Sequence, residues 1–599
     1  MSLGSLLTSP PLAASPSRAL PTLGASLRPD GVHFALHATN AKACAVRLFD
    51  PQGVVLETVP LQSRGEGLFA ADVTSAQVGT LYKFVLDDRE LPDPYARWLP
   101  QGVHGPAVVV DTHPAFQSLR VGRPLKNHVI YELHVGTFTS EGTYAAAMKR
   151  LPYLAELGVT TIELMPIAAF DGAHGWGYDG VALFAPHAPY GTPAELREFV
   201  EAAHRFGLSV LLDVIYNHFG PSGNYLSAYA PDYFTKEIQN AWGDAPNFAN
   251  PFVRQLVIDN ALYWLNEFHF DGLRLDATHV IADSSPRHIL RELAAEVKKA
   301  HPHAVLFAED ERNDTVLIDE YGLDGLWADD FHHVVRVTLT GETDGYYAAY
   351  PRGTAAIAET INAGWFFRGQ IYPTTGKPRG TEAGHLEPQR FVYCIQNHDQ
   401  IGNRAQGDRL TDIISPEAYA AVSTLLLFLP MTPLLFQGQE WAATTPFQFF
   451  TDHDPQLGKL ISEGRRREFQ HFESIAKATV PVPDPQAPST FERSKLRWEE
   501  LVEDRHQGVH FLYRRLLRLR REDPVLDGSS EVKARAVGPV LEVVRRSEAG
   551  TRVLLVNFSA EVASVSSCAT GGSVVLATCD VTEAMTELPG YGAVILSQG

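Results

Sequence analysis

Hydrophobic and polar positions follow three different patterns along the chain, and each pattern predicts a different kind of structure. From about residue 25 to residue 112, apolar and polar side chains alternate in short runs such as Gly31–His37, Ala43–Phe49 and Leu81–Leu86. A period of two is typical of strands that bury one face, and turn-forming residues separate the runs. Residues 1–112 therefore predict a flexible leader followed by a small N-terminal β-sandwich.

Between residues 113 and 525, apolar runs alternate with helical patterns. The predicted strands are His128–Val135, Val159–Ile167, Leu208–Ile215, Gly272–Leu275, Val305–Ala308, Gly325–Trp327, Phe391–Ile395 and Pro433–Phe436. The clearest helical patterns are Pro193–Phe206, Val253–Phe268 and Val509–Arg521. Apolar strands that alternate with helices are typical of a parallel sheet covered on both faces. Eight such strands predict a (β/α)8 barrel with inserted loops.

Short strands return in residues 526–599. The runs are Val540–Val544, Val553–Val556, Val574–Leu576 and Ala593–Leu596. They predict a C-terminal antiparallel β domain. The whole chain is therefore predicted to have an α/β fold, with a central barrel between two β domains.

Charge and cysteine content narrow the range of partners. The 599 residues include 50 Lys+Arg and 70 Asp+Glu, a formal net charge of −20, which repels phosphate backbones and anionic lipid. No apolar run reaches the roughly 18 residues that a membrane helix needs. Four cysteines without a CxxC pair, and an N-terminus interrupted by prolines with no basic residue before Arg18, make a secreted disulfide scaffold a poor match. We expect a cytoplasmic monomer that binds a neutral ligand, with neither nucleic acid nor membrane as partner.

The carboxyl ends of the predicted barrel strands carry the candidate chemistry, because barrels of this type build their active sites there. Carboxylates follow four consecutive late strands: Asp276, Glu309, the pair Asp329 and Asp330, and Asp399. Histidines stand beside most strand ends: His218, His279, His332, His333 and His398. One Asp at a strand end often only caps the next helix. Four such ends in register, each with a polar neighbour, favour a shared polar cleft.

Three carboxylates in one cleft suit the cleavage of a glycosidic bond. One carboxylic acid protonates the leaving oxygen, and one carboxylate attacks the anomeric carbon. Crowding raises the pKa of one carboxyl, which keeps the acid protonated near neutral pH. Arg274 and Asp276 are two residues apart on a strand and face the same way, so the guanidinium can hold Asp276 ionised and oriented as a nucleophile. No cysteine or basic cluster suggests a metal or a cofactor, and we expect neither.

Four motifs, in matching order and spacing, resemble the four sequence regions of the α-amylase family. They are Asp213–His218, Gly272–Asp276, Glu309 after an apolar strand, and Asn397–Asp399. The resemblance implies a retaining double displacement with Asp276 as nucleophile, Glu309 as acid/base and Asp399 as the carboxylate that grips the sugar. It further implies that Arg274, His218 and His398 contact the same sugar. Tyr178, in the turn Trp176–Gly180, would stack on it. The family's calcium-binding pattern is not evident.

Two groups within that family share the segments Tyr131–Phe138 and Trp176–Gly180: glucan-branching transferases, and hydrolases that cut trehalose from maltooligosyl chains. The segments 306–313, 327–333, 397–404 and 437–441 resemble the hydrolases. The resemblance therefore implies hydrolysis of the α-1,4 bond between a maltooligosyl chain and a terminal trehalose. Maltooligosyltrehalose and malto-oligosaccharides would be the ligands. A branching transferase stays open because it would use the same acids, and so, with less support, does a non-catalytic glucan-binding protein.

The leaving-group side of the cleft is predicted from strand 6, which lies between the strands of Glu309 and Asp399. The predicted contacts there are Asp329, Asp330, His332, His333, Gln400 and Asn403. Alternation along the chain would turn only one member of each pair inward. The rim position of His279 favours contacts to sugar hydroxyls, as for His218 and His398. The run Arg465–Arg467 is expected to be solvated.

Overall fold

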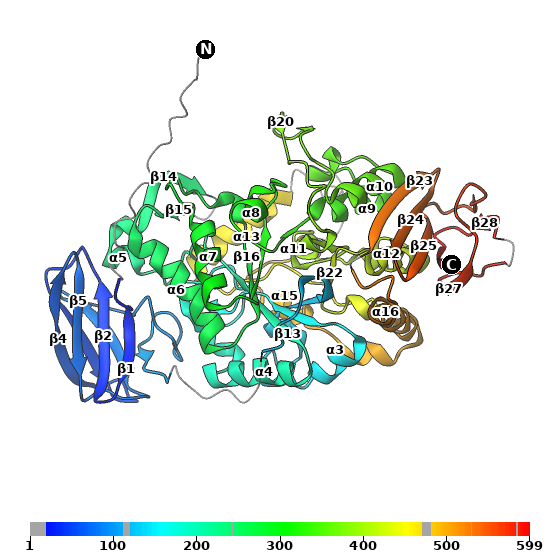
Figure 1. Cartoon of the computed structure of the whole chain (residues 1–599). Helices are drawn as coiled ribbons and strands as arrows, with labels where there is room; N and C mark the ends of the chain where they lie inside the picture. The colour runs from blue at the N-terminus through cyan, green and yellow to red at the C-terminus, as the bar shows by residue number, and fades with distance from the viewer. Residues whose placement is uncertain are drawn as a thin grey trace, which may run out of the picture.

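The structure, a computed structural model, describes residues 20–111, 120–240, 243–469, 481–528, 530–582 and 585–598. A β-rich N-terminal part, a central barrel and a C-terminal sheet follow one another across the molecule (Figure 1). The predicted leader, up to residue 19, lies outside the described residues. No helix in the described ranges is long and apolar enough to span a bilayer.

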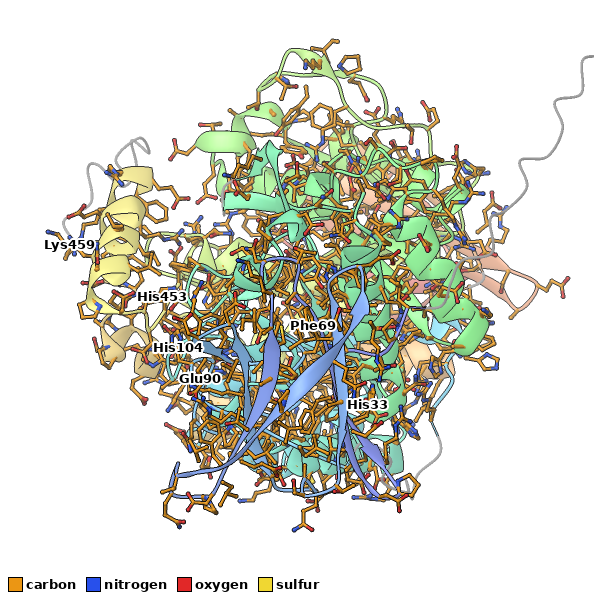
Figure 2. The ribbon with its side chains drawn as sticks, turned by 90° about the vertical axis from the view of Figure 1, so that its left-hand side faces the viewer. His33, Phe69, Glu90, His104, His453 and Lys459 are labelled. Carbon is orange, nitrogen blue, oxygen red and sulfur yellow. The ribbon has the colours of Figure 1, made fainter. Side chains whose placement is uncertain are left out.

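The N-terminal part is one sheet folded into two halves. Its strands are β1 (Gly24–Arg28), β2 (Gly31–His37), β3 (Cys44–Phe49), β4 (Val55–Gly65), β5 (Leu68–Val73), β6 (Leu81–Leu86), β7 (Arg89–Leu91) and β8 (Ala107–Val108). The long strand β4 pairs with β3 in one half and with β5 in the other. Phe34 and Tyr82 pack between the halves with ring centroids 4.9 Å apart. This is the predicted β-sandwich, seen face-on in Figure 2 around Phe69 and His33.

The central part is a closed barrel of parallel strands. Around the barrel these are β9 (Ile130–Leu133), β10 (Thr161–Leu164), β13 (Ser209–Val214), β16 (Gly272–Leu275), β17 (Val305–Glu309), β18 (Gly325–Trp327), β21 (Phe391–Cys394) and β22 (Thr432–Phe436). Each strand lies within its predicted run or extends one residue beyond it, which confirms the predicted barrel. The pairing of β22 with β9 closes the ring.

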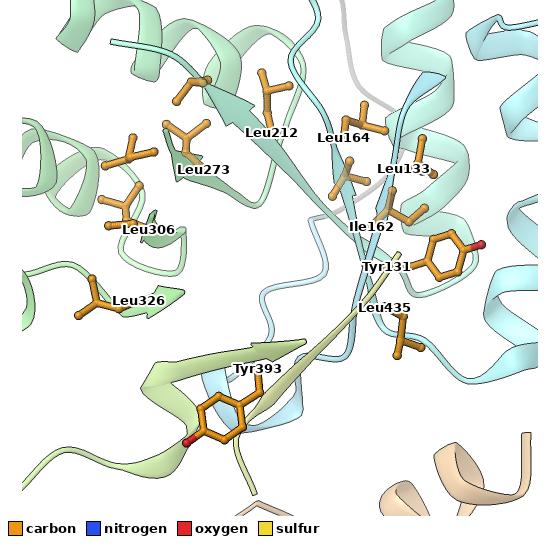
Figure 3. Packing of buried hydrophobic residues seen from close by; sticks show 14 of the residues in the cluster. Tyr131, Leu133, Ile162, Leu164, Leu212, Leu273, Leu306, Leu326, Tyr393 and Leu435 are labelled. Atoms are coloured by element: carbon orange, nitrogen blue, oxygen red, sulfur yellow. The ribbon is translucent and has the colours of Figure 1, made fainter. Parts of the chain in front are cut away.

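Side chains of the barrel strands alternate between the helices outside and the barrel interior. Outward residues such as Tyr131, Leu212 and Leu306 pack in one large core with the surrounding helices (Figure 3). These helices include α4 (Pro193–Arg205), α6 (Pro251–Glu267), α12 (Pro416–Phe428) and α16 (Asp504–Glu522). Inward residues such as Ile130 and Phe307 form a separate apolar cluster. The period of two therefore separates the packing core from the interior that leads to the site.

The barrel interior carries charged side chains above that apolar cluster. Glu132 follows the inward Ile130 by two residues, and Asp213 follows the inward Leu211 in the same way. Glu163 pairs in register with Glu132 on the neighbouring strand. The expectation that these strands are apolar throughout is wrong at these positions, because an inward side chain near the top of the barrel packs against the polar site.

The C-terminal sheet has the order β23 (Glu531–Val537), β24 (Val540–Ser547), β25 (Gly550–Asn557), β29 (Ala593–Gln598) and β27 (Ser573–Ala577). Its pairings are antiparallel, as predicted. Asn362 on α10 (Thr354–Ala363) exchanges two 2.8 Å hydrogen bonds with the backbone of Ala534 on β23. Arg545 donates to the carbonyl of Phe428 over 2.8 Å. The sheet is thereby fixed to the barrel helices.

Candidate active site

Arg274 is the centre of a charged network at the carboxyl ends of the strands. It lies on β16 with no exposed surface. Its Nη1 donates to both oxygens of Asp213, over 2.8 and 2.7 Å, and to Oδ1 of Asp276 over 2.9 Å. Its Nη2 donates to Oε2 of Glu309 over 2.7 Å. One buried guanidinium therefore brings three carboxylates together, and two of them, Asp276 and Glu309, are among the predicted site residues.

Asp276 is oriented from two sides. Arg274 holds Oδ1, and the amide of Asn217 donates to Oδ2 over 2.8 Å and to the backbone carbonyl of Asp276 over 2.9 Å. Both carboxylate oxygens thus accept hydrogen bonds in the ionised form, which a nucleophile requires. Asn217 was not among the predicted site residues, although it belongs to the motif Asp213–His218.

Glu309, the last residue of β17, faces Asp276 across the same guanidinium. Its Oε2 accepts a second hydrogen bond, over 2.9 Å, from the backbone N–H of Ala277. The φ of Ala277 is +40°, an uncommon left-handed value for a residue with a Cβ. The strained turn after the nucleophile thereby orients the second acid. Strain of this kind clusters at functional sites.

His398 and Asp399 begin the helix α11 (His398–Gly402), directly after β21. The ring of His398 stacks on Tyr178, with centroids 5.3 Å apart. Its Nε2 lies 2.7 Å from the Tyr178 hydroxyl and 3.6 Å from Oδ1 of Asp399. Asn403 donates to the same Oδ1 over 3.1 Å. Burial raises the pKa of Asp399, and the neighbouring charge of His398 opposes that rise.

Tyr178 and His218 form one wall of the site, beside Asp213. The Tyr178 hydroxyl donates to Oδ2 of Asp213 over 2.7 Å, and Nε2 of His218 lies 2.8 Å from the Tyr178 carbonyl. Nδ1 of His218 also contacts the Asn217 side chain. Burial raises the pKa of Asp213 to about 7, against the lowering effect of Arg274. Tyr178, His218, Arg274, Asp276, Glu309, His398, Asp399 and Asn403 therefore belong to one connected network.

Asp329 is a further carboxylate beside this network, which already holds Asp213, Asp276, Glu309 and Asp399. It is the first residue of α9 (Asp329–Thr340), which follows β18. Burial, with the charges of Glu309 and Asp399 close by, raises the pKa of Asp329 to about 7. A carboxyl group near its pKa can donate or accept a hydrogen bond at neutral pH. Asp329 is therefore suited to a sugar hydroxyl between the two catalytic strands.

Asp330 has a different position from Asp329. It has no exposed surface, and its oxygens accept from the Tyr350 hydroxyl over 2.6 Å, from the Asn313 amide over 2.7 Å and from the backbone N–H of Phe367 over 2.8 Å. These hydrogen bonds hold together the loops around β18, the sixth strand of the barrel. The carboxylate of Asp330 is engaged by protein groups, so it shapes the cleft and does not present an oxygen to it.

His332, His333 and Gln400 form a layer next to the network. Nδ1 of His332 lies 3.1 Å from Nδ1 of His333, and Gln400 accepts from the hydroxyls of Tyr346 and Tyr347 over 3.2 and 3.4 Å. Burial lowers the pKa of His333 to about 3 and that of His332 well below 6.5. Both rings are therefore neutral. Nε2 of His332 is buried without a hydrogen-bond partner among the described residues.

His279 lies at the rim, away from the guanidinium. It belongs to the short 3-10 helix η4 (Thr278–Val280), and its Nε2 is 3.8 Å from the exposed Glu311. The structure thus places it beside Glu311 and outside the central network.

Arg465 is a site neighbour that the sequence analysis misassigned. It lies on α13 (Pro455–Phe469), the helix at the edge of Figure 2 that carries Lys459. Its side chain is only 9% exposed, and it donates to the carbonyl of Gly402 over 2.7 Å. The guanidinium also packs on the ring of Phe449, 5.1 Å from the centroid. The expectation that it is solvated is wrong, because α13 covers the end of α11.

No group of three or more His, Cys, Asp or Glu residues within the described ranges is placed to hold a metal ion. The chemistry offered by the central network is that of carboxylates, one guanidinium, the phenol of Tyr178 and the imidazoles of His218 and His398. A pair of carboxyl groups at a sugar cleft is the arrangement of glycoside hydrolases.

Two family models match parts of the chain. Residues 134–241 match the catalytic domain of alpha amylase, and residues 22–96 match carbohydrate-binding module 48, the isoamylase N-terminal domain. The barrel, its carboxylate network and these matches define an α-amylase family glycoside hydrolase.

Relatives place the chain more narrowly. It is 51% identical over 553 residues to the malto-oligosyltrehalose trehalohydrolase of Deinococcus radiodurans, covering 91% of this chain and 90% of the relative. The chain belongs to the malto-oligosyltrehalose trehalohydrolase family. A crystal structure of a Salmonella typhimurium protein described as an alpha amylase superposes with a TM-score of 0.90 at 39% identity, covering 97% of this chain and 100% of that one. The 1,4-alpha-glucan branching enzyme of Nitratidesulfovibrio vulgaris is 34% identical over 277 residues, covering 41% of this chain and 43% of the enzyme.

Proposed function

We propose that this protein hydrolyses the α-1,4-glucosidic bond that joins a maltooligosyl chain to a terminal trehalose unit, and so releases trehalose. The observation that carries the proposal is the junction of Asp276 and Glu309 on the Arg274 guanidinium, in a barrel of this family. Its relatives act, by their names, on malto-oligosyltrehalose.

The reaction proceeds by two displacements at the anomeric carbon. Glu309 gives its proton to the glycosidic oxygen while Asp276 attacks the anomeric carbon, so trehalose leaves and a glycosyl ester forms on Asp276. Glu309, now ionised, then takes a proton from a water molecule. The hydroxide oxygen attacks the same carbon and the ester bond to Asp276 breaks. The anomeric configuration is retained because each displacement inverts it once.

The sugar whose bond breaks is held by residues on both sides of the acids. Asp399 offers an acceptor to its hydroxyls, Tyr178 offers a ring face on which a pyranose can pack, and His398 orients both of these residues. His218 and Arg274 support this wall from behind, because Arg274 has no exposed surface and both ring nitrogens of His218 contact protein groups. The interactions of Asp276 and Asp399 with the sugar strengthen as positive charge develops at the anomeric carbon, because these two carboxylates face that charge.

The leaving side recognises trehalose. Trehalose joins two glucoses through both anomeric carbons, so its shape departs from the curve of an α-1,4 chain. Asp329 and Asn403 lie beside the acids, and His332 and Gln400 belong to the layer of buried polar groups next to them. Buried polar groups of this kind discriminate strongly, because a sugar of the wrong shape leaves them unpaired.

Product analysis tests the proposal and separates it from the branching alternative. The enzyme is incubated with maltooligosyltrehalose, with a malto-oligosaccharide of equal length, and with amylose. We expect free trehalose from the first substrate, a much higher kcat/KM for it than for the second, and no α-1,6 branches in amylose. Branch points in amylose without free trehalose would assign the chain to the transferases instead. Binding without turnover of any substrate would favour a glucan-binding protein.

Three further properties belong to the proposal. We place the enzyme in the cytoplasm, which is supported by four free thiols at Cys44, Cys394, Cys568 and Cys579. We infer a monomer, which light scattering can test.

We also set the domain boundaries near residues 112 and 525, in the segments between β8 and the barrel and between α16 and β23. Limited proteolysis at these segments tests the division.

A further inference from the structure

Glu132 lies directly beneath the site, and both of its carboxylate oxygens contact one residue, His398. It projects inward from β9 and is 1% exposed. Its Oε1 lies 2.5 Å from Nδ1 of His398, and its Oε2 accepts the backbone N–H of the same residue over 2.9 Å. Glu132 therefore fixes both the ring and the backbone at the start of α11, and does not reach the cleft itself.

Glu163 is a second buried carboxyl group beside Glu132. The two residues pair in register on neighbouring parallel strands, so their side chains face the same interior. Glu163 has no exposed surface, and neither of its oxygens has a hydrogen-bond partner among the described residues. Burial, followed by the neighbouring charge of Glu132 and that of Asp213, raises the pKa of Glu163 well above its usual range, although Arg274 and His398 oppose the rise.

The environment of His398 distinguishes its two ring nitrogens. Nδ1 faces Glu132, and Nε2 faces the Tyr178 hydroxyl and Asp399. The rings of Trp176 and Trp327 cover it, 5.8 and 6.1 Å away between centroids. A carboxylate on one side and polar oxygens on the other accept from both N–H groups of an imidazolium, whereas a neutral ring would leave one acceptor unmatched.

The charges around His398 agree with that geometry. Burial lowers its pKa, but Glu132 and then Asp399 outweigh burial and raise the pKa to about 10, while Arg274 acts in the lowering direction. His134, the other histidine close by, is neutral because burial lowers its pKa to about 3. At neutral pH the interior therefore pairs one carboxylate with one imidazolium.

We propose that Glu132 is a positioning residue for glycosidic cleavage: it holds His398 as an imidazolium that orients Tyr178 and Asp399, while Glu163 keeps its proton and contributes no charge. This inference rests on the proposed function, since it assigns a charge state to the site that cleaves the bond. The imidazolium donates from Nε2 to the Tyr178 hydroxyl and attracts Asp399, so it fixes both groups at the cleft. It also offsets part of the negative charge of Asp399.

Glu132→Gln is the direct test, with Glu163→Gln as the matched control. A Gln at position 132 keeps the shape of the side chain and one acceptor oxygen, for Nδ1–H. It loses the acceptor for the His398 backbone N–H, and it removes the charge that stabilises the imidazolium. We expect kcat of Glu132→Gln to fall as the pH rises through neutrality, by about a hundredfold near pH 8, and to recover on acidification. Glu163→Gln replaces one neutral group by another and should follow the wild-type pH profile. A purely structural role of Glu132 would instead lower activity equally at every pH.

A titration without substrate keeps this test independent of the proposed function. In protein with ¹⁵N-labelled histidine, the His398 signal is assigned by its loss in His398→Asn. We expect His398 to stay protonated well above neutral pH in the wild type and to titrate several pH units lower in Glu132→Gln. A neutral His398 at pH 7 in the wild type, or an unchanged titration in Glu132→Gln, would overturn the inference. So would a Glu163→Gln pH profile that matches that of Glu132→Gln.

The two proposals fail in different ways. If the wild type releases no trehalose but His398 titrates as expected, the proposed function is wrong and the assignment of the imidazolium stands. If trehalose is released and His398 is neutral, the reverse holds. Should Glu132→Gln lose its native circular dichroism spectrum, the wild-type titration alone still decides the charge of His398.

Discussion

Ala277 donates its backbone N–H to Oε2 of Glu309 over 2.9 Å. Because Ala277 follows Asp276 directly, the residue after the nucleophile orients the acid/base, and a shift of one acid moves the other. The left-handed φ of +40° at Ala277 makes this turn costly, by roughly 1–2 kcal/mol. The Arg274 guanidinium, which bonds to both acids, holds the turn in place.

The three central acids should be indispensable for turnover. Asp276→Asn removes the nucleophile and Glu309→Gln removes the proton donor, and each should raise the chemical barrier by several kcal/mol, about a thousandfold or more in kcat. Asp399→Asn should be nearly as damaging. Steady-state kinetics with circular dichroism measures this, and Glu320→Gln, exposed at the end of α8 (Val316–Asp319), is the control. Near-normal turnover in any of the three would remove that residue from the mechanism.

The stereochemistry of the product should report direct attack by Asp276. In retaining enzymes the two carboxyl groups stand about 5–5.5 Å apart, too close to admit a water between them and the sugar. The newly formed reducing end of the maltooligosyl product should therefore appear first as the α anomer. Proton NMR in the first minutes of turnover, before mutarotation, distinguishes the anomers. Initial β product would mean that water attacks directly.

Asp329 should make the folded protein less stable as the pH rises. Its pKa of about 7 lies above that of an unfolded Asp. Its contribution to the free energy of unfolding is therefore complete below about pH 4 and is lost as the pH rises to about 7. Asp329→Asn cannot ionise, so we expect it to melt a few degrees above the wild type near pH 8 and at about the same temperature near pH 4. Equal melting differences at both pH values would contradict the shifted pKa.

His332 should contribute to recognition of the leaving sugar. Its buried Nε2, unpaired among the described residues, would gain a partner from a sugar hydroxyl. We expect His332→Ala to raise KM for maltooligosyltrehalose by about tenfold, the cost of one lost hydrogen bond, with a smaller effect on kcat. His385→Ala, at an exposed ion pair with Asp319, is the control. A folded His332→Ala enzyme with unchanged kinetics would move the subsite elsewhere.

Substitution of Arg465 should lower the stability of the protein and raise KM, whereas substitution of the adjacent Arg466 should have little effect. Arg465→Met loses the hydrogen bond to Gly402 and the guanidinium packing on Phe449, so we expect a loss of about 1–3 kcal/mol in stability and a higher KM. Arg466→Met changes a side chain that is 55% exposed and should stay within about 0.5 kcal/mol of the wild type. Thermal melts and kinetics of the two variants compare them directly. Equal effects would show that α13 does not stabilise α11 through Arg465.

The fold could be predicted from the sequence because the patterns that indicate its strands and helices are local. A strand such as Gly272–Leu275 is apolar and bounded by turns, and its observed limits are those predicted. The helix predicted at Pro193–Phe206 is observed at Pro193–Arg205, where Thr192 and Glu195 form a capping box at its start. The hydrophobic period of a strand or helix and the capping residues of a helix depend only on residues that are close along the chain.

The sequence allowed us to predict site residues only where they stand at the ends of strands. Asp276 and Glu309 were identified in this way, but Asp329 and Asp330 have the same local pattern and take different positions. The direction in which each carboxylate turns depends on loops far away in the sequence, such as the one that brings Phe367 to Asp330. Glu132 and Glu163 were missed because a single acidic residue in an apolar run gives no sign of which face it occupies. Its inward position becomes meaningful only when the ring is closed.

The contact between Glu132 and His398 also constrains how the chain folds. The two residues are 266 positions apart, on the first strand of the barrel and after the seventh. Until the last strand joins the first, Glu132 has no cation to neutralise it, and a carboxylate enclosed without one is strongly unfavourable. A partly assembled ring must therefore keep this interior hydrated. The loss of water from the barrel interior and the closure of the barrel are therefore coupled and occur late in folding. The ion pair between Glu132 and His398, which orients groups of the site, also stabilises the closed ring.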